Sequence, residues 1–412
     1  MKYVIIGNGP AAVSCIDGIR SVDPDGSITV ISKEDHPAYF RPLISYYLEG
    51  KSKAENIYCR RADFYESSNC GVIHSEAVAI DTDNRSVMLK NGESIPYDRL
   101  CICTGSSPFV PPMKGLETVE NKYTFLTVDD SFAIEKAITK DSRVLIIGAG
   151  LIGLKCAEGL RDRVQSVTVC DLAPRVLSSI LDDECAAIVQ KHLENCGIGF
   201  SLGNTADRFD GNTAMMKDGS EIGFDVLVLA LGVRPNIGFF KEAGGACGRA
   251  IIVDNEMKTS VDGIFAAGDC VEQYDISFGD KRIMALLPNA NLGGYTAGVN
   301  MAGGSAEFDN AVPMNSIGFW GLHMMTAGTY ANDENAQMIE EKGEKSIKRF
   351  FIKNNRLVGF IIIGDVKSAG IYTNLIRTQA DISAYDPDAL TKNATLLPFG
   401  ENYRRKTLGG VV

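Results

Sequence analysis

Two short glycine-rich segments of this chain have the spacing of a turn that binds phosphate. The first is a GxGxxA segment after the apolar residues 3–6, and the second is a GxGxxG segment after the apolar residues 144–147. In such a turn the first glycine permits a tight strand-to-helix reversal, and the second lets the backbone approach a pyrophosphate. The third small residue lets the helix pack on the strand, and the helix N-terminus faces the phosphates. The candidate phosphate-binding residues are Gly7, Gly9, Pro10, Ala11, Ala12, Gly148, Gly150, Leu151, Ile152 and Gly153.

Each glycine segment is followed by a second apolar run that ends on a carboxylate. Glu34 lies 27 residues after Gly7, and Asp171 lies 23 residues after Gly148. A carboxylate at this position accepts hydrogen bonds from a ribose diol. One glycine triplet alone is weak evidence, since it is also an ordinary tight turn. Here the complete pattern of a strand, a glycine turn, a helix and a distal acid occurs twice. The sequence therefore predicts two bound dinucleotides.

Composition limits the class of protein. The chain has 412 residues, of which 45% are hydrophobic and 23% charged, as in a globular protein of two or three domains. The longest uncharged apolar stretch, residues 144–154, is shorter than the roughly 18 residues that a membrane span needs. The first strand begins almost at Met1, so we expect no leader peptide and a cytoplasmic protein. A net charge of −11 argues against nucleic acid as a partner.

The cysteines and histidines indicate no metal site. The eleven cysteines contain no CxxC, the closest pair being Cys101 and Cys103, and there are only four histidines. We therefore expect reduced, mostly structural thiols, with neither zinc nor an iron–sulfur cluster.

The rest of the chain divides into further segments. Residues 106–115 are rich in proline and glycine and indicate a linker before the second nucleotide unit. Residues 346–352 and 357–364 alternate in polarity around an Asn-rich turn, which predicts a β-hairpin. We expect a helix over residues 369–379, followed from residue 381 by a tail that wraps around the protein or extends from it.

These motifs resemble the FAD-dependent pyridine nucleotide oxidoreductases, specifically the branch of rubredoxin reductases and of the flavin modules of nitrite reductases. Residues 104–106 (TGS), 230–236 (ALGVRPN) and 267–269 (AGD) carry the resemblance beyond the two glycine segments. The resemblance implies an α/β fold with two Rossmann-like dinucleotide-binding domains and a small α+β domain. It implies an FAD domain over residues 1–113 and 243–308, an inserted NAD domain over 114–242, the α+β domain over 309–385 and a tail over 386–412.

The resemblance also implies the cofactor sites. FAD is expected at the first glycine segment, with Asp269 at its ribityl chain or pyrophosphate. The helix that starts at Pro288 is expected to face the flavin, or to be a plain helix start. NADH is favoured over NADPH because Asp171 would repel a 2′-phosphate, although Arg175 lies nearby. Besides the glycine segments, the expected cofactor-binding residues are Glu34, Arg41, Pro42, Val78, Thr104, Gly105, Asp171, Gly232, Asp269, Pro288, Asn289 and Ala290.

Two departures from the family pattern bear on catalysis. Relatives that use a redox-active cysteine carry it where this chain has Pro42, so we expect electrons to leave the flavin directly. Arg41 and Pro42 would then form the turn that faces the flavin, unless Arg41 is a surface residue. Lys155 replaces a glutamate that most relatives place near the nicotinamide and flavin N5. This lysine would stabilise reduced flavin, or else lie exposed on a helix outside the site.

The expected activity is transfer of electrons from NADH through FAD to a rubredoxin, a ferredoxin or an iron–sulfur subunit of a partner enzyme. Two alternatives stay open: an NADH oxidase or diaphorase, and a flavoprotein that senses NADH or binds a partner. Residues 50–61 carry a net charge of +3 and are a candidate docking surface for an acidic redox protein, or simply a solvated loop. The third domain could form a homodimer interface.

Overall fold

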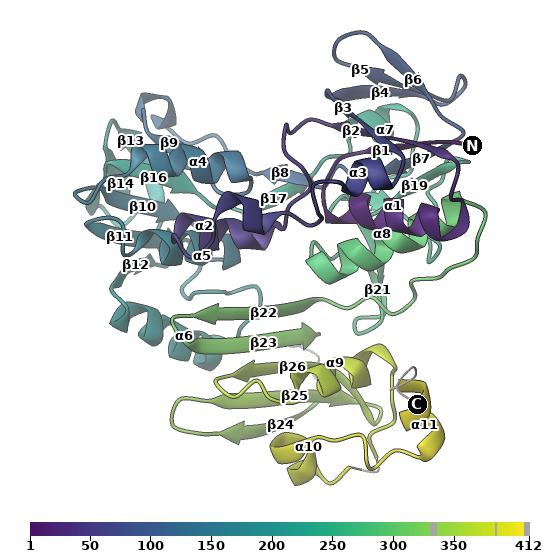
Figure 1. Ribbon diagram of the computed structural model, residues 1–412. Coiled ribbons are helices and arrows are strands. Elements are labelled where there is room, and N and C mark those ends of the chain that lie inside the picture. Colours follow the sequence, from purple (N-terminus) through teal and green to yellow (C-terminus); the bar gives the residue numbers. More distant parts are fainter. Residues whose placement is uncertain (330–335, 384, 408–412) are drawn as a thin grey trace. The chain divides into compact units, whose positions relative to one another are not determined.

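The computed structural model describes residues 1–329, 336–383 and 385–407 (Figure 1). Its chain forms two compact units. The first consists of Met1–Ser179, Leu193–Gln273 and Lys281–Asp309, and the second of Ile180–His192, Tyr274–Asp280 and the chain from Asn310 onward.

The first unit begins with a parallel sheet of five strands in the order β19-β7-β1-β2-β3. Helices α1 (Pro10–Val22) and α8 (Leu287–Met301) pack against each other beside this sheet. Glycines permit their close approach, because a Cβ built on Gly294 or Gly298 would lie 2.1 Å from a carbonyl oxygen of α1. The strands are β1 (Lys2–Ile6), β2 (Ser27–Ser32), β3 (Cys70–His74), β7 (Arg99–Ile102) and β19 (Ile264–Ala266).

A second parallel sheet of the first unit has the order β12-β11-β10-β16-β9. Its central strand is apolar and buried, as a strand covered on both faces must be. Helices α4 (Val128–Ala137) and α5 (Leu151–Leu160) flank it, and the short helix α2 (Ile44–Leu48) packs against both. The strands are β9 (Lys122–Thr124), β10 (Arg143–Ile147), β11 (Ser166–Asp171), β12 (Ile198–Leu202) and β16 (Val226–Leu229). The two predicted Rossmann-like units are thus confirmed.

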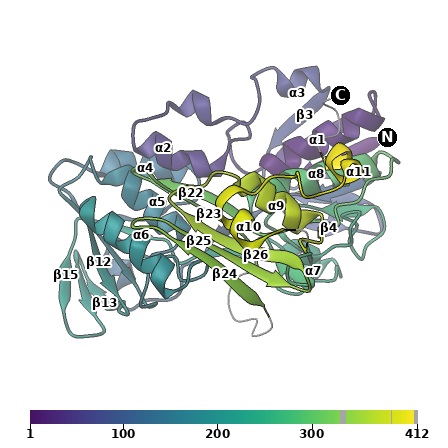
Figure 2. The ribbon, with the colours of Figure 1, turned by 90° about the horizontal axis from the view of Figure 1, so that it is seen from below.

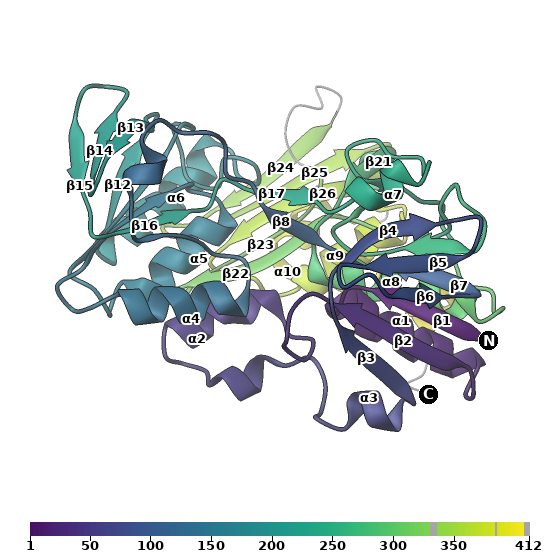
Figure 3. The same ribbon diagram turned by 90° about the horizontal axis from the view of Figure 1, so that it is seen from above.

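A pair of short antiparallel strands, β8 (Ser106–Pro108) and β17 (Val233–Pro235), crosses between these two sheets (Figure 3). The predicted linker therefore begins as one strand of a two-stranded connection. Asn236 fastens the connection, since its Nδ2 donates to the Thr104 carbonyl at 3.0 Å and its own carbonyl accepts from the Thr104 hydroxyl at 2.7 Å.

Shorter elements complete the first unit, and two of them, β20 and β21, include residues that are assigned to the second unit. They are η1 (Arg41–Leu43), η2 (Ala54–Ile57), α3 (Phe64–Ser67), β4 (Ala77–Asp81), β5 (Ser86–Leu89), β6 (Ser94–Pro96), η3 (Leu116–Thr118), β13 (Ala206–Asp210), β14 (Thr213–Met216), β15 (Glu221–Gly223), α7 (Gly238–Glu242), β18 (Ile251–Ile252), β20 (Val271–Asp275) and β21 (Asp280–Ile283).

The second unit is built on an antiparallel sheet of order β22-β23-β26-β25-β24, with α9 (Ala369–Arg377) and α10 (Pro387–Asn393) over one face (Figure 2). The predicted hairpin is confirmed as the β25–β26 pair, whose turn residues Asn354 and Asn355 both have positive φ, 51° and 55°. The strands are β22 (Met314–Phe319), β23 (Leu322–Gly328), β24 (Gln337–Lys342), β25 (Ile347–Lys353) and β26 (Arg356–Ile363).

Helix α6 (Asp183–Asn195) follows the second glycine segment in sequence, yet most of it belongs to the second unit. The guanidinium of Arg349, a side chain only 8% exposed, binds Asp182 and Glu340 at 2.5 Å each and also binds Glu184. This cluster around the buried Arg349 joins the start of α6 to the sheet. The domains expected from the sequence placed α6 in the NAD domain, over residues 114–242, whereas residues 180–192 group with the second unit.

The tail covers helix α9 at least as far as Tyr403. The rings of Phe399 and Tyr403 stack at 4.4 Å, and the Tyr403 hydroxyl lies 2.9 Å from that of Thr378. Helix α11 (Glu401–Thr407) ends the described part, and the last five residues of the predicted tail lie outside it. Among the described residues, no helix is long and apolar enough to cross a membrane.

Candidate active site

The first glycine turn leads from β1 into α1. Gly7 has φ +106°, and a Cβ built on it would lie 2.2 Å from the carbonyl oxygen of Cys103, so only glycine fits. This contact brings the turn beside Thr104 and Gly105, whose contact with FAD stays a prediction. At Gly9, in contrast, a built Cβ meets no atom of the described residues within 4 Å. The turn therefore has an open side at the start of α1, the side on which a pyrophosphate is expected.

The second glycine turn repeats this geometry between β10 and α5. Gly148 has φ +118°, and its built Cβ would lie 2.2 Å from the carbonyl oxygen of Ala230, close to Gly232. Gly150 again faces open space as far as the structure describes the chain. A Cβ on Gly153 would lie 1.9 Å from the carbonyl oxygen of Gly148, so the third glycine lets the helix pack on its own turn.

The N-termini of these two helices leave backbone amides available for an anion. Helices α1 and α5, both wholly within the described chain, have no side-chain cap and no acidic residue in the first turn. Helix α4 shows the contrast, because Thr127 and Asp130 cap it reciprocally. Uncapped N–H groups at a glycine turn are the groups that bind phosphate.

Other predicted FAD residues gather around the first turn. A Cβ on Gly268 would lie 3.1 Å from the Cβ of Ala11 and 3.9 Å from that of Ala290, so the turn before Asp269 lies between the starts of α1 and α8. Ser106 Oγ donates to Asp269 Oδ2 at 3.1 Å. Burial raises the pKa of Asp269, although Arg41 and the Ser106 hydroxyl act to lower it.

Glu34 is held by two side chains of the loop that follows it. Tyr39 Oη donates to Glu34 Oε2 at 2.6 Å, and Arg41 donates to Glu34 Oε1 at 3.2 Å. Arg41 therefore lies beside Glu34, and its contact with FAD stays a prediction. Tyr39 was not predicted, since a tyrosine in a loop has no sequence signature for this role. Each carboxylate oxygen of Glu34 keeps a lone pair for a ribose hydroxyl.

Asp171 at the end of β11 is held by backbone amides instead. Its Oδ2 accepts from Ala149 N in the glycine turn at 2.6 Å, and its Oδ1 accepts from Ala173 N at 2.8 Å. The carboxylate is thus fixed beside the second turn with lone pairs left for a ribose diol, as the NAD prediction requires.

Lys155 lies on the face of α5 that packs against α2. Its side chain is 17% exposed, its Nζ forms an ion pair with the buried Glu158, and it lies 4.8 Å from the ring centre of Tyr46. The lysine is therefore not exposed, and its place beside the flavin stays a prediction. Glu158 balances the charge, so any effect of Lys155 on a nearby flavin would be smaller than that of an isolated cation.

The remaining predicted residues lie as follows. Pro42 is in η1 and exposed, and Pro288 and Asn289 are in the first turn of α8, where Asn289 is buried. Val78 is 41% exposed on β4, and its contact with FAD stays a prediction.

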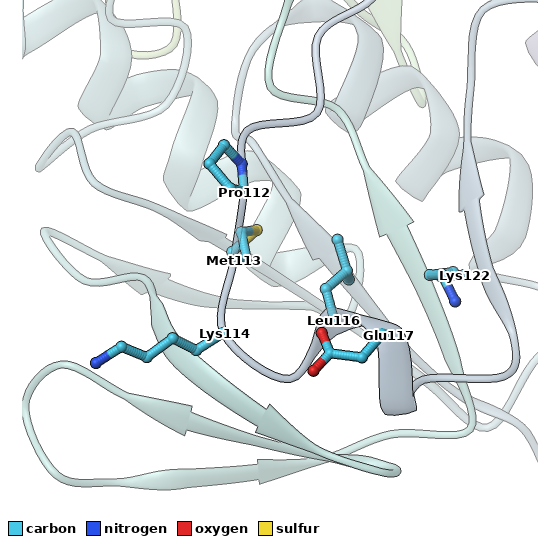
Figure 4. A pocket seen from close by; sticks show the side chains of 6 residues that line it. All are labelled: Pro112, Met113, Lys114, Leu116, Glu117 and Lys122. Carbon is cyan, nitrogen blue, oxygen red and sulfur yellow. The ribbon is translucent and has the colours of Figure 1, made fainter.

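A surface hollow of about 510 Å³ lies where the linker enters the second sheet (Figure 4). None of its lining residues belongs to a glycine turn, so it is separate from the nucleotide sites. It is lined by Pro112, Met113, Lys114, Leu116, Glu117 and Lys122. Within the described chain, no group of three or more His, Cys, Asp or Glu side chains gathers that could hold a metal ion.

Comparison with protein families shows which family this chain belongs to. Residues 1–294, which contain both glycine turns and the Asp269 turn, match the family described as pyridine nucleotide-disulphide oxidoreductase. The chain belongs to this family. Residues 313–380 match a further model, described as the C-terminal domain of rubredoxin NAD+ reductase. The family and fold expected from the sequence are confirmed, and FAD and a nicotinamide nucleotide are the cofactors of the family's two sites.

Individual relatives extend the comparison. An NADH oxidase of Methanocaldococcus jannaschii is 36% identical over 321 residues, covering 75% of this chain and 71% of its own. The epsilon subunit of an NADH-dependent phenylglyoxylate dehydrogenase of Aromatoleum evansii is 28% identical over 392 residues and 93% of both chains. The solved covalent complex of putidaredoxin reductase with putidaredoxin contains a similar fold, with TM-score 0.87, 23% identity and coverage of 95% of this chain and 96% of that one.

Proposed function

We propose that this family member passes electrons from NADH through FAD to a small iron–sulfur protein, namely a rubredoxin, a ferredoxin or an iron–sulfur subunit of a partner enzyme. One observation carries the proposal: the turn where a redox-active cysteine is expected contains Arg41, Pro42 and Leu43 and no thiol. Without such a relay, the electrons pass from the flavin to an external acceptor.

The chain's own residues would bind and orient the two cofactors. When bound, FAD supplies the acceptor for a hydride and the donor of single electrons. The amides at the start of α1 and the open side of Gly9 would hold its pyrophosphate, and Glu34 its ribose. The start of α5 and Asp171 would hold NADH in the same way. The match of residues 313–380 to a rubredoxin NAD+ reductase domain supports a protein acceptor.

The thiols support the same assignment. All eleven cysteines lie in the described part of the chain, and none of them is in a disulfide. Cys59, which is close in sequence to the flavin-facing turn, has its pKa raised by burial to about 12. Such a thiol is almost fully protonated near neutral pH and is a poor nucleophile. Reduced cysteines also fit a cytoplasmic location, which is part of this proposal.

A second candidate is an NADH oxidase, and the 36% identity to the Methanocaldococcus jannaschii protein favours it. The two are separated by steady-state oxidation of NADH with rubredoxin, a [2Fe–2S] ferredoxin and oxygen at equal concentrations. The proposal expects the fastest turnover with one of the two proteins. Turnover that is fastest with oxygen and unchanged by either protein would favour the oxidase.

The docking surface predicted over residues 50–61 is smaller than the sequence alone suggested. Lys51 pairs with Glu49 at 2.5 Å, and Arg60 pairs with Asp17. Lys53 and Arg61 are exposed, and within the described chain neither has an ion pair. These two cations are the ones left to steer an acidic acceptor.

The test replaces Lys53 and Arg61 with glutamine. Acceptor reduction should slow several-fold at low salt and little at high salt, whereas flavin reduction by NADH should stay the same. The control replaces two other exposed cations with glutamine. They are Arg208 in β13 and Lys217 directly after β14. An equal effect in the control variant would show that only net charge matters, and the docking site would then lie elsewhere.

A further inference from the structure

Tyr39 makes one part-buried and one buried hydrogen bond. Together they join the two halves of the first unit, namely the half built on the sheet that contains β1 and the half built on the sheet that contains β10. The residue is 5% exposed and lies between Glu34 and Arg41 in sequence. Its hydroxyl donates to Glu34 Oε2 at 2.6 Å and accepts from the backbone N of Val128 at 3.2 Å. Glu34 is the carboxylate beside the first glycine turn, whereas Val128 is the first residue of α4 in the second half.

The bond to Val128 completes the cap of α4. Asp130 N already donates to Thr127 Oγ1 at 3.1 Å, and Thr127 N donates to the Asp130 carboxylate at 2.8 Å. Val128 N is a further donor at this helix end, and a buried N–H without an acceptor costs about 1–3 kcal/mol. The Tyr39 hydroxyl supplies that acceptor from a different segment of the chain.

The bond to Glu34 fixes the carboxylate. A phenol has one proton, and here it points to Glu34, which leaves the oxygen lone pair for Val128. Burial and the neighbouring Glu34 raise the pKa of Tyr39, so the phenol stays protonated and keeps this direction. Together with Arg41 on the other carboxylate oxygen, Tyr39 holds Glu34 in one orientation.

A second contact joins the loop after Glu34 to the start of α4, and it is more exposed than the first. His36 Nε2 lies 2.8 Å from Asp129 Oδ1, but the Asp129 side chain is 63% exposed. Exposed ion pairs contribute little, about 0–1 kcal/mol. The buried tyrosine is therefore the stronger of the two connections.

We propose that Tyr39 is a positioning residue that orients Glu34 for the ribose of FAD and couples FAD binding to the N-terminus of α4. The inference rests on the assignment of the first glycine turn to FAD. It goes beyond that assignment, because occupancy of the FAD site would then stabilise a helix of the NAD half.

The main test is Tyr39→Phe, which removes one oxygen atom and keeps the ring. FAD should dissociate from this variant about tenfold more readily, since a hydrogen bond to a charged group is lost. The readout is the dissociation constant for FAD, from the change in flavin fluorescence on titration of the apoprotein. Tyr47→Phe is the matched control: Tyr47 of α2 donates to Glu135 of α4, so the control loses a Tyr–Glu bond between the same halves but none to Glu34. It should bind FAD within about twofold of the unmodified protein.

Hydrogen–deuterium exchange gives a second test, in which the unmodified protein is compared with the Tyr39→Phe variant. FAD should slow exchange at the Val128 amide, and Tyr39→Phe should abolish that protection. Unchanged exchange at Val128 on FAD binding would overturn the coupling.

The variants also separate this inference from the FAD assignment. Glu34→Gln should weaken FAD binding if Glu34 contacts the ribose. Weak binding by Glu34→Gln with unchanged binding by Tyr39→Phe would overturn the role of Tyr39 alone. Unchanged binding by Glu34→Gln would overturn both the ribose contact and this inference. Equal losses in Tyr39→Phe and Tyr47→Phe would mean that α4 is merely loosened, and the positioning role would be wrong.

Discussion

The two glycine turns have the same backbone path but reach close packing in different ways. In the second turn, Gly153 lets α5 pack within van der Waals distance of its own turn, the carbonyl of Gly148. The first turn has Ala12 at the corresponding position. There the close approach is between helices, because Gly294 and Gly298 of α8 bring that helix against the backbone of α1. Both turns also pack on the end of a neighbouring strand, at Cys103 and Ala230, but only the first has its helix packed closely on a second helix almost 300 residues away.

Asp171 and Glu34 likewise differ in whether local or distant groups hold them. Asp171 is held by amides of its own turn and strand end, at Ala149 and Ala173. Glu34 is held by side chains of a later loop, one of which also contacts α4 of the other half. One motif therefore makes two kinds of site. The second is fixed locally, and the first is fixed by the rest of the fold.

The largest expected effect tests the packing difference. Gly153→Ala should destabilise the apoprotein by about 3 kcal/mol, because the added methyl overlaps a backbone carbonyl that has little room to move. Ala12→Gly, the reverse exchange in the first turn, should cost only about 1 kcal/mol from the flexibility of glycine in a helix. Urea unfolding of the two variants measures both values. Equal losses would mean that the two turns pack alike.

The next prediction tests the two acids. Asp171→Ala should weaken NADH binding about tenfold and narrow the preference for NADH over NADPH, because the group that repels a 2′-phosphate is removed. FAD content should not change. Glu34→Gln should show the opposite pattern, with lower FAD affinity and unchanged preference between the two nicotinamide nucleotides. Faster flavin reduction by NADPH than by NADH in the unmodified protein would contradict the assignment of Asp171.

The same contrast explains what the sequence could predict. Strand, glycine turn, helix and acid are local patterns, so both Rossmann-like units and the β25–β26 hairpin were predicted correctly. Tyr39 could not be found, because its partners at residues 34 and 128 come together only in the folded chain. The cluster around Arg349 joins residues more than 160 positions apart. No periodicity in the sequence indicates that α6 packs with the C-terminal sheet.

A smaller effect is expected from Asp269 in the first site. Its pKa is raised in the folded protein, so the folded state disfavours the charged form and loses stability as the pH rises above the ordinary value of about 4. Asp269→Asn should therefore raise the melting temperature of the apoprotein at neutral pH, and the gain should vanish below about pH 4. Thermal melts of both apoproteins across this range measure it. A gain that persists at low pH would mean that burial of the charge is not its cause.

The smallest effect is expected at Cys59, in a segment that is hydrogen-bonded to the loop that fixes Glu34. Cys59 N donates to the Ala38 carbonyl at 2.7 Å, so this residue lies beside the segment that carries Tyr39. If its thiol took part in electron transfer, the loop would have a catalytic role in addition to positioning. Its pKa of about 12 argues against this, because only a minute fraction of the thiol is ionised near neutral pH. Cys59→Ser should leave the rate of acceptor reduction within about twofold, with the Tyr39→Phe variant as the comparison for loss of FAD. A charge-transfer band on reduction by NADH that is present in the unmodified protein and missing in Cys59→Ser would reveal a thiol next to the flavin. The first turn would then differ from the second in chemistry as well as in the way it is held.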